Sequence, residues 1–367
     1  MRILHVVRQF APSVGGLEAY VASLAQHQQQ AGHQVAVLTL NRLFMARTEE
    51  KLSAHETVDG IPVRRIGFTG TRRLFVPHIS PSMLKGYDII HVHNTDGFFD
   101  TLALLRPFLK AKLVATTHGG FFHTPDFGLF KRIWFNCITR LTIRAYAHMF
   151  AISGNDFATF HQMMPRLSLQ PNAVTPMAPT LCSGEDFLYV GRLAPHKNLP
   201  GLLQTYAELR KRGINGTLHI VGSPWGVAVE DLQSLAKSLR IASHVRLHGH
   251  LDGAALAKRA TTCGFFVSAS RFEGFGMSML EAMGAGLVPL VHANASFAEL
   301  LDTANLGVCT DMESPVAAAE RIAAYLPTVT GFTRQQAQAF AARYNWPALT
   351  AATLAVYQSL LNGKTSA

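Results

Sequence analysis

Short apolar runs alternate with amphipathic stretches along the chain, and this alternation is the first indication of its fold. In the first half, the stretch Leu17–Ala31 has the spacing of a helix, and Gly32 marks its end. Buried strands are predicted at Ile3–Val7, Gln34–Leu40, Ile61–Ile66, Ile89–His93, Leu113–Thr117 and Met149–Ile152, with a long helical stretch around Gly128–Ala147. Strands that alternate with helices predict a parallel sheet covered on both faces.

The same pattern starts again after Gln170–Pro179, a segment with three prolines and no apolar periodicity, where we expect a linker. Predicted strands follow at Phe187–Val190, Thr217–Val221, Val245–His248, Cys263–Ser270 and Val288–Val291. Predicted helices lie at Leu199–Arg212, Val229–Leu239, Ala254–Ala260, Pro315–Tyr325 and Thr333–Ala342. We therefore expect two similar α/β domains in tandem, residues 1–172 and 180–344, facing each other across a ligand-binding cleft.

Composition supports a globular protein. The 367 residues suit two domains, and 48% apolar against 15% charged residues excludes a disordered chain. Apolar runs fall short of the ~18 residues that span a bilayer, and the N-terminus lacks the apolar core of a signal peptide. We predict a cytoplasmic protein. Its four cysteines are scattered, so neither a disulfide framework nor a zinc site is expected.

The net charge of +10 is concentrated in the first half, where residues 1–175 hold 18 Lys/Arg against 10 Asp/Glu. This predicts an anionic partner: a membrane surface, a phosphate-bearing acceptor or nucleic acid. The aromatic-basic grooves that bind nucleic acid are not recognisable, so we expect none. A membrane or acceptor surface is predicted at Lys131, Arg132, Trp134, Phe135, Arg140 and Arg144, where bases mix with apolar residues at helical spacing. A core-packing helix with a basic wet face is the alternative.

The most informative motif is the glycine-rich segment from Glu273 to Gly286, which joins a predicted strand to a predicted helix. Gly274 and Gly276 let the backbone approach a ligand, and free amides at the helix start favour an anion. Glu273 and Glu281 are eight residues apart, so they could bind sugar hydroxyls at one end and a ribose at the other. A solvated helix start with ordinary charges is the structural alternative.

A second motif, Gly191–Asn198, follows the first strand of the second half. Arg192 and Lys197 flank a turn that contains Pro195, so both side chains could reach one point beyond the strand. Two cations there suit a diphosphate, because arginine binds two oxygens in plane and lysine adds a point charge. A surface loop with incidental bases is the alternative.

Weaker signals lie in the first half. The paired Gly15-Gly16 follows the first strand and could let a phosphate or sugar approach a helix start. His118 ends a predicted strand before two glycines, where it could bind a reacting sugar or serve as a structural histidine. His91 and His93 point to one face of a strand, and His248 and His250 form a similar pair, but without carboxylate or thiol companions we do not expect a metal site.

Taken together, these motifs resemble those of the retaining GT-B glycosyltransferases of the large family 4 type. The resemblance rests on Gly15-Gly16, His118, Gly191-Arg192, Lys197, Glu273 and Glu281. It extends to Tyr344-Asn-Trp346, which looks like the crossing into a final helix, residues 345–367, that packs back on the first domain. A narrower similarity, to mannosyltransferases of acetan- and xanthan-type exopolysaccharide assembly, rests on the segments 5–16, 117–124 and 270–276.

The resemblance implies roles for individual residues. Arg192 and Lys197 would neutralise the departing diphosphate, Glu281 would bind the ribose, and Glu273 the sugar hydroxyls. His118 would contact the sugar near its C6 hydroxyl, and Gly16 would approach the donor phosphate or the acceptor. Backbone of Phe275, Gly276 and Met277 would offer amides, and Gly222 would line the nucleotide pocket. Asn172-Ala173-Val174-Thr175 departs from the family's Asn-Gly-Val-Asp, so that loop's role is open.

By this resemblance, the first domain binds the acceptor and the second a nucleotide sugar. The reaction would move mannose, with retention, from GDP-mannose to a polyprenyl-diphosphate-linked cellobiosyl acceptor, forming an α-1,3 bond. No metal or other cofactor is expected, and the enzyme would sit on the anionic inner face of the plasma membrane. The alternatives are a transferase of this fold with a UDP-sugar or a small acceptor, and a nucleotide-sugar-binding protein without catalysis.

Overall fold

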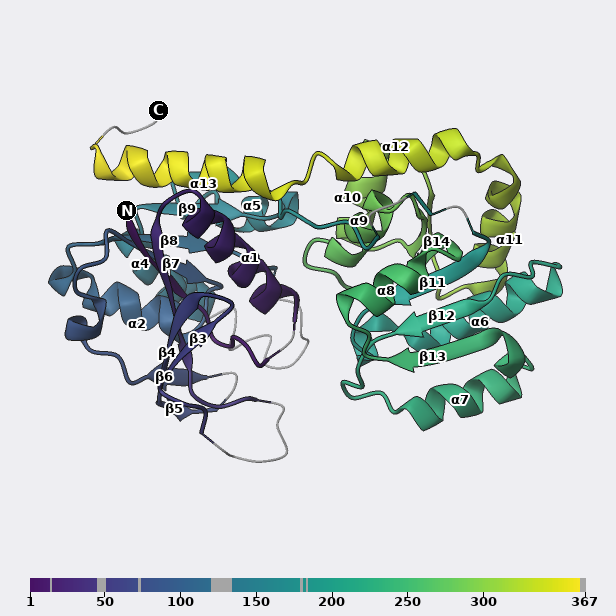
Figure 1. Cartoon of the computed structure of the whole chain (residues 1–367), viewed down its shortest axis with the longest axis horizontal. Helices are drawn as coiled ribbons and strands as arrows, with labels where there is room; N and C mark the ends of the chain where they lie inside the picture. The colour runs from purple at the N-terminus through teal and green to yellow at the C-terminus, as the bar shows by residue number, and fades with distance from the viewer. Residues whose placement is uncertain are drawn as a thin grey trace. The chain divides into compact units, whose positions relative to one another are not determined.

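The computed structural model describes residues 1–13, 15–44, 51–71, 74–119, 134–178, 181–182 and 184–363. The chain divides into two compact units (Figure 1). Residues 1–173 and 346–367 make up the first unit, and residues 174–345 make up the second. Each unit is an α/β sandwich built on a mainly parallel sheet.

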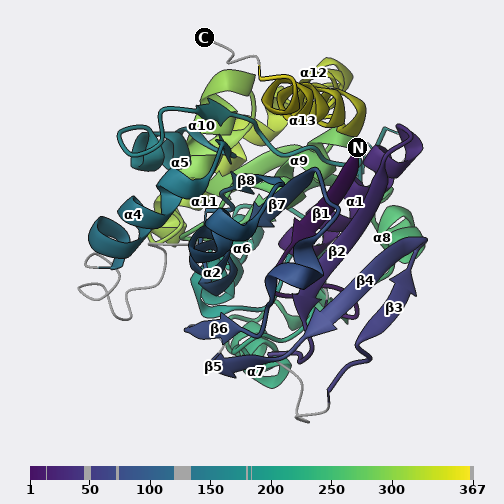
Figure 2. The same cartoon turned by 90° about the vertical axis from the view of Figure 1, so that its left-hand side faces the viewer.

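Within its described residues, the first unit has an eight-stranded sheet in the order β10-β9-β8-β7-β1-β2-β4-β3. Only β3 runs antiparallel to its neighbour, at the edge seen in Figure 2. The strands are β1 (Arg2–Val6), β2 (Gln34–Leu40), β3 (His55–Val58), β4 (Ile61–Ile66), β7 (Ile89–His93), β8 (Lys112–Thr116), β9 (His148–Ala151) and β10 (Leu167–Leu169). A separate hairpin pairs β5 (Phe68–Gly70) with β6 (Phe75–Pro77).

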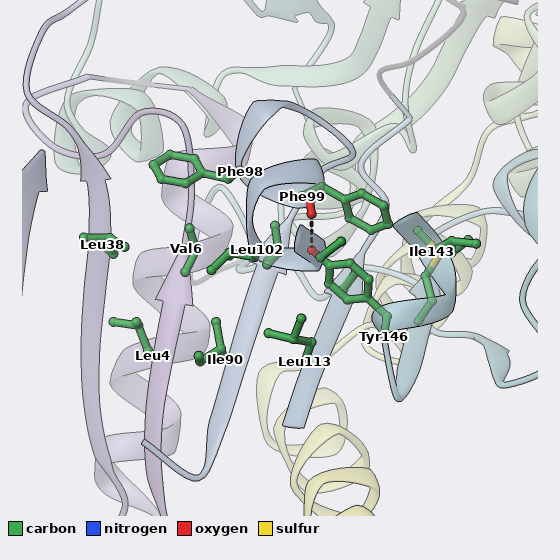
Figure 3. Packing of buried hydrophobic residues seen from close by; sticks show 14 of the residues in the cluster. Leu4, Val6, Leu38, Ile90, Phe98, Phe99, Leu102, Leu113, Ile143 and Tyr146 are labelled. Carbon is green, nitrogen blue, oxygen red and sulfur yellow. Dashed lines mark hydrogen bonds between the residues drawn. The ribbon is translucent and has the colours of Figure 1, made fainter. Parts of the chain in front are cut away.

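Alternation of side chains along these strands creates two apolar cores, one on each face of the sheet. Leu4 and Val6 of β1 pack in one core with Phe99 from the first helix that follows β7. Tyr146 stacks on Phe99 at 4.1 Å and donates its hydroxyl to the Phe99 carbonyl at 2.8 Å (Figure 3). Ile3 of β1 belongs to the core on the opposite face. One strand therefore supplies both layers.

Helices of the first unit cover both faces. They are α1 (Gly16–Gln30), α2 (Gly97–Leu105), α4 (Arg140–Thr142), α5 (Gly154–Phe160) and α13 (Trp346–Leu361), with short turns η1 (Pro81–Leu84), η2 (Arg106–Phe108), η3 (Phe135–Thr139) and η4 (Ile143–Ala145). The C-terminal α13 lies beside α1, where Trp346 meets Tyr20 at 5.5 Å and Tyr357 is fully buried. The last helix of the chain thus completes the first unit.

The second unit has a six-stranded parallel sheet in the order β13-β12-β11-β14-β15-β16 among its described residues. Its strands are β11 (Asp186–Val190), β12 (Leu218–Val221), β13 (Val245–Gly249), β14 (Cys263–Ser268), β15 (Val288–His292) and β16 (Val308–Thr310). Its helices are α6 (Leu199–Lys211), α7 (Val229–Ser238), α8 (Gly253–Ala260), α9 (Met277–Gly284), α10 (Ala295–Ala304), α11 (Pro315–Tyr325) and α12 (Gly331–Ala341), with turns η5 (Pro195–Lys197), η6 (Ala242–His244) and η7 (Leu326–Thr328).

Most predicted elements are confirmed, and four (β2, β4, β7 and α11) have the predicted bounds. The helices α2, α5 and α10 were not predicted from the sequence. Each begins at a side-chain cap, since Asp96, Ser153 and Asn294 accept hydrogen bonds from amides of the first turn. Those caps are the sequence signal that could have revealed these helices, which have between seven and ten residues.

The long helix predicted around Gly128–Ala147 is only partly covered by the described residues. From Trp134 onward, the chain forms a π-helical turn in η3, one turn of α-helix in α4 and a 3-10 turn in η4. A regular α-helix does not extend through this part of the prediction.

Candidate functional site

The turn between β14 and α9 carries Glu273 and is fixed by polar contacts from α10. Ser296 donates its hydroxyl to the Glu273 carbonyl at 2.7 Å, and Asn294 donates its amide to the Ser270 carbonyl at 2.8 Å. Gly276 caps α9 with φ +100°, a conformation that suits glycine. These contacts hold the Glu273 backbone in place just before a helix N-terminus, whose first amides lack intrahelical acceptors.

The loop between β11 and α6 carries the two predicted cations and packs closely against Gly222. Gly222, after β12, has φ +154°, and a Cβ there would lie 1.8 Å from the Gly191 carbonyl oxygen. The amide of Leu193 also donates to the Ser223 carbonyl at 2.9 Å. Gly222 therefore lets the loops after β11 and β12 come into contact, on both sides of Arg192 in the sequence.

Arg192, Lys197 and Glu273 come together at the carboxyl ends of β11 and β14. Lys197 Nζ lies 2.7 Å from Glu273 Oε1, and these side chains are only 15% and 13% exposed. The Arg192 guanidinium stacks over the Trp225 ring at 4.6 Å. Burial lowers the pKa of His196, the charges of Lys197 and Arg192 lower it as well, and that of Glu273 raises it, so all three charges act on this one ring.

Trp225 is a residue of this cluster that sequence reasoning missed. A flat indole beneath a guanidinium restricts its orientation and adds cation–π attraction. The available signal was its place in Gly222-Ser-Pro-Trp225, a strand-end loop adjacent to the predicted nucleotide pocket.

Glu281 lies further along α9 and is not part of the ion-pair cluster. Burial raises the pKa of its carboxyl to about 7. Among the described residues, its side chain has no hydrogen-bond or ion-pair partner, whereas its backbone carbonyl accepts from Met177 at 2.9 Å. A half-buried carboxylate without donors is suited to hydroxyl groups of a ligand.

Phe275 and Met277 flank the helix cap. The Phe275 side chain is 7% exposed and its ring meets Tyr344 at 5.8 Å, so this side chain packs in the fold. Met277 is half-buried and is the first residue of α9. Only their backbone amides are available for the predicted ligand contacts.

In the first unit, Gly16 is the exposed first residue of α1. Glu18, in the same helical turn, accepts a hydrogen bond from the Ser13 hydroxyl at 3.0 Å. A Cβ at Gly15 would lie 2.5 Å from the Glu18 carboxylate. The start of α1 therefore combines backbone amides with an acidic side chain, which suits a hydroxyl-bearing ligand as well as an anion.

His118 follows β8 and is partly exposed. Its Nε2 atom lies 3.2 Å from Nδ1 of His93, and its ring meets Tyr20 edge-on at 5.0 Å. Burial lowers the pKa of His118 to about 3, so the ring is neutral near pH 7. His118 is thus a neutral hydrogen-bonding group anchored to the sheet.

The predicted membrane surface is rearranged by the structure. Lys131 and Arg132 lie outside the described residues. Phe135 is 8% exposed and packs in the core, which corrects its expected place on the surface. Trp134 is half-buried and donates Nε1–H to Asp100 at 3.0 Å.

The exposed side chains of this segment come from its other face. Arg140 and Arg144 are exposed, and the apolar Ile138 and Leu141 between and beside them are 37% and 64% exposed. Bases and apolar side chains thus alternate on an accessible surface. No helix in the described part of the chain is both long enough and apolar enough to cross a bilayer.

The histidine pair on β7 has a companion that the sequence did not suggest. His5 of β1 brings its ring nitrogens within 4.8 Å of those of His91 and His93, a spacing that could hold a metal. Every ring nitrogen of these three residues already has a hydrogen-bond partner. The histidines therefore form a hydrogen-bonded network within the fold.

Two family models together cover most of the chain. The model for Glycosyltransferase Family 4 matches residues 14–176, and the model for Glycosyl transferases group 1 matches residues 183–328. The first match lies in the first unit except for its last residues, and the second lies within the second unit.

Two relatives align along nearly their whole length. The GDP-mannose:cellobiosyl-diphosphopolyprenol alpha-mannosyltransferase of Xanthomonas oryzae pv. oryzae is 36% identical over 362 residues, which cover 94% of this chain and 93% of that protein. The protein of the same name from Komagataeibacter xylinus is 34% identical over 373 residues, with 98% and 94% covered.

Solved structures share the fold at low identity. Sucrose-phosphate synthase from Thermosynechococcus elongatus superposes with a TM-score of 0.77 at 18% identity, covering 99% of each chain. Anabaena Alr3699/HepE, solved with UDP and glucose, gives 0.75 at 17% identity, covering 98% of this chain and 100% of that one. At these identities the similarity concerns the fold alone.

Proposed function

Because this chain belongs to the GT-B glycosyltransferases of the family 4 type, we propose that it transfers mannose from GDP-mannose to a polyprenyl-diphosphate-linked cellobiosyl acceptor. The names of relatives with 34–36% identity over nearly the whole chain support this donor and this acceptor. The observation that carries the chemistry is the ion pair of Lys197 with Glu273, together with Arg192 on the same loop as Lys197.

The two cations have the role of stabilising the leaving group. When the bond from mannose to the diphosphate breaks, negative charge builds on the phosphate oxygens. Arg192, whose guanidinium lies over the Trp225 ring, would bind two of those oxygens in plane, and Lys197 would add a point charge. This charge compensation needs no divalent ion, so we propose a reaction without a metal or other cofactor.

The two carboxylates have the role of holding hydroxyl groups. Glu273 would accept hydrogen bonds from the mannose hydroxyls, while its contact with Lys197 orients its carboxylate. Glu281, which has no partner of its own among the described residues, would accept from the ribose. Gly222 would line the nucleotide pocket, and the amides of Phe275, Gly276 and Met277 would face the phosphates.

We propose retention of configuration through attack on the same face that the diphosphate leaves. The acceptor hydroxyl would give its proton to the departing phosphate, which then needs no carboxylate base beneath the sugar. His118 would contact the mannose near its C6 hydroxyl, and Gly16 would approach the donor phosphate or the acceptor. The first unit is thus assigned to the acceptor and the second to the nucleotide sugar.

A lipid-linked acceptor requires the protein to work at a membrane. The exposed Arg140 and Arg144, with Ile138 and Leu141, suit the anionic inner face of the bacterial plasma membrane. We propose peripheral association through this surface. The chemistry gives no reason to involve nucleic acid.

A donor screen tests the proposal. Purified protein is incubated with a cellobiosyl-diphosphopolyprenol acceptor and GDP-mannose, UDP-glucose or UDP-N-acetylglucosamine, and products are identified by mass and by anomeric configuration. We expect a mannosylated, α-linked product from GDP-mannose only. Turnover with a UDP-sugar alone would overturn the donor assignment, and donor binding without turnover would indicate a binding protein.

A further inference from the structure

Three histidines and a glutamine form a continuous series of hydrogen bonds inside the first unit. His5 lies on β1, His93 on β7 and His118 just after β8, and these strands are neighbours in the parallel sheet. Gln28 comes from α1, which covers this face. His91 lies beside them but is not part of this series, because its two ring nitrogens contact Thr116 and Tyr357.

Each link of the chain joins specific atoms. Gln28 Oε1 lies 2.8 Å from His5 Nε2, and His5 Nδ1 lies 2.9 Å from His93 Nε2. The last link joins His93 Nδ1 to His118 Nε2 at 3.2 Å. Gln28, His5 and His93 are completely buried, so water does not compete for these bonds. Of these four residues, only His118, at the end of the hydrogen-bond series, is partly exposed to solvent.

The rings of this chain are neutral. Burial lowers the pKa of His5 to about 4 and that of His118 to about 3. Burial also lowers the pKa of His93 far below its usual range, and the neighbouring rings of His91, His5 and His118 act in the same direction. A neutral imidazole has one nitrogen that donates and one that accepts. The position of the proton on one ring therefore fixes the position of the proton on the next ring.

The glutamine determines which nitrogen of each ring carries the proton. A carbonyl oxygen can only accept, so Gln28 Oε1 requires the proton of His5 to be on Nε2. His5 Nδ1 then accepts from Nε2–H of His93, and His93 Nδ1 accepts from Nε2–H of His118. Nδ1 of His118 is left as an acceptor, and it has no partner among the described residues.

We propose that Gln28, His5 and His93 are positioning residues that fix His118 as the Nε2–H tautomer, so that its Nδ1 accepts a hydrogen bond from a hydroxyl of the donor sugar. The choice of a sugar hydroxyl rests on the proposed function, whereas the tautomer rests on the hydrogen-bond chain alone. An Nδ1 acceptor selects ligands with a hydroxyl at this point and disfavours ligands that present only a carbonyl or phosphate oxygen.

Nitrogen NMR of histidine-labelled protein tests the tautomer without any ligand. The protonated and unprotonated nitrogens of a neutral ring resonate far apart, and loss of one signal set in His118→Asn assigns His118. We expect the wild-type protein to show a protonated Nε2 and an unprotonated Nδ1 at pH 7. A proton on Nδ1, or a protonated ring, would overturn the proposal.

A variant tests whether Gln28 is the source of the polarity. Gln28→Leu removes the acceptor, so we expect the His118 tautomers to mix or reverse while the protein remains folded by circular dichroism. Gln30→Leu is the matched control, because Gln30 is exposed on the same helix, and it should leave the His118 signals unchanged. An unchanged Nε2–H tautomer in folded Gln28→Leu would contradict the role of Gln28, and the wild-type tautomer decides the proposal if this variant does not fold.

Kinetics separate this inference from the proposed function. With GDP-mannose, Gln28→Leu should lower kcat/KM by about two- to tenfold, the value of one hydrogen bond, with Gln30→Leu unaffected. If the wild-type tautomer is as expected but no donor is turned over, the proposed function is wrong and the positioning role of Gln28, His5 and His93 stands. If turnover is normal with His118 protonated at Nδ1, the positioning role is wrong and the proposed function stands.

Discussion

The ion pair between Lys197 and Glu273 joins residues that are 76 positions apart in the chain. Both side chains are largely shielded from water, so each charge depends on the other for stabilisation until a ligand arrives. Under the proposed function, Lys197 would bind phosphate and Glu273 would bind hydroxyls, so the pair would lie at the junction of the sugar and the diphosphate. A sugar diphosphate is the kind of ligand that both groups can bind at once.

Replacing the lysine should separate catalysis from folding. In Lys197→Ala, we expect kcat/KM to fall by about 10²–10³, because one preorganised charge at the leaving group is lost. The matched control is Lys211→Ala, which removes a lysine whose side chain is 70% exposed and paired with Glu208. Activity assays measure the turnover of both variants, and thermal melts show whether each is folded. Full activity in folded Lys197→Ala would contradict the assigned role.

The raised pKa of Glu281 makes a prediction about pH. A carboxyl with a folded-state pKa of about 7, above its usual 4.5, favours the protonated state in the folded protein. Stability without ligand should therefore fall as pH rises from about 4.5 to 7, and Glu281→Gln should abolish that fall, with a gain of up to about 3 kcal/mol at pH 8. Urea unfolding at pH 5 and pH 8 measures it.

The same variant should bind donor more weakly, because an amide cannot fully replace a carboxylate that accepts two ribose hydroxyls. Calorimetric titration with GDP at pH 8 measures the affinity. A variant that gains stability and keeps full affinity would remove Glu281 from the nucleotide site.

At the scale of elements, the site depends on loops that approach each other closely at the ends of β11 and β12. Gly222→Ala would force a Cβ against the Gly191 carbonyl, so the Arg192 loop would have to move. We expect a loss of about 2 kcal/mol or more in stability and a large loss of turnover. The control, Gly253→Ala, has open space at its Cβ and should be neutral or stabilising by ~0.5 kcal/mol. Chemical unfolding measures the stability of the two variants, and activity assays measure their turnover.

The segment from η3 to η4 turns Phe135 inward and Arg140 and Arg144 outward. Replacing both arginines by serine should weaken binding to anionic vesicles by about 30-fold at low salt, since each base near the surface contributes ~1 kcal/mol. Lys237→Ser with Arg321→Ser removes two exposed bases from the second unit and serves as the control. Flotation with phosphatidylglycerol vesicles measures binding. Equal binding by both double variants would place the membrane surface elsewhere.

At the scale of the whole molecule, the chain returns to its first unit after completing the second. Trp346, Leu354 and Tyr357 of α13 are buried in the core that α1 also covers. Burying one large apolar side chain contributes about 1.5–3 kcal/mol, so several of them approach the total stability of a domain, about 5–15 kcal/mol. The first unit should not fold stably without the last helix.

Truncation tests this dependence. A chain that ends at Asn345 should lose protection from hydrogen exchange throughout residues 1–173, while residues 174–345 keep it. A chain that ends at Gly363 retains all of α13 and should behave like the full-length protein. Uniform protection in the shorter chain would show that α13 is dispensable.

Features of this protein whose cause is local could be predicted from its sequence. The apolar runs at Gln34–Leu40 and Ile61–Ile66 became strands with the predicted bounds, because side-chain alternation and flanking turns act over a few residues. Glycine-rich strand ends likewise indicated the Glu273 turn and the Arg192 loop. Short helices such as α2 were missed, since a length of nine residues gives little periodicity and the cap at Asp96 was not used.

By itself, then, the sequence determined the two α/β units, the strand-end motifs and the family to which they belong, because each depends on residues that are close together in the sequence. Only the tertiary structure decided which distant side chains meet. It paired Lys197 with Glu273, turned Phe135 into the core, left the Glu281 side chain without a partner among the described residues, and aligned His5, His93 and His118. Such contacts follow from sheet order and register, which bring positions tens of residues apart within hydrogen-bonding distance and leave no pattern along the chain.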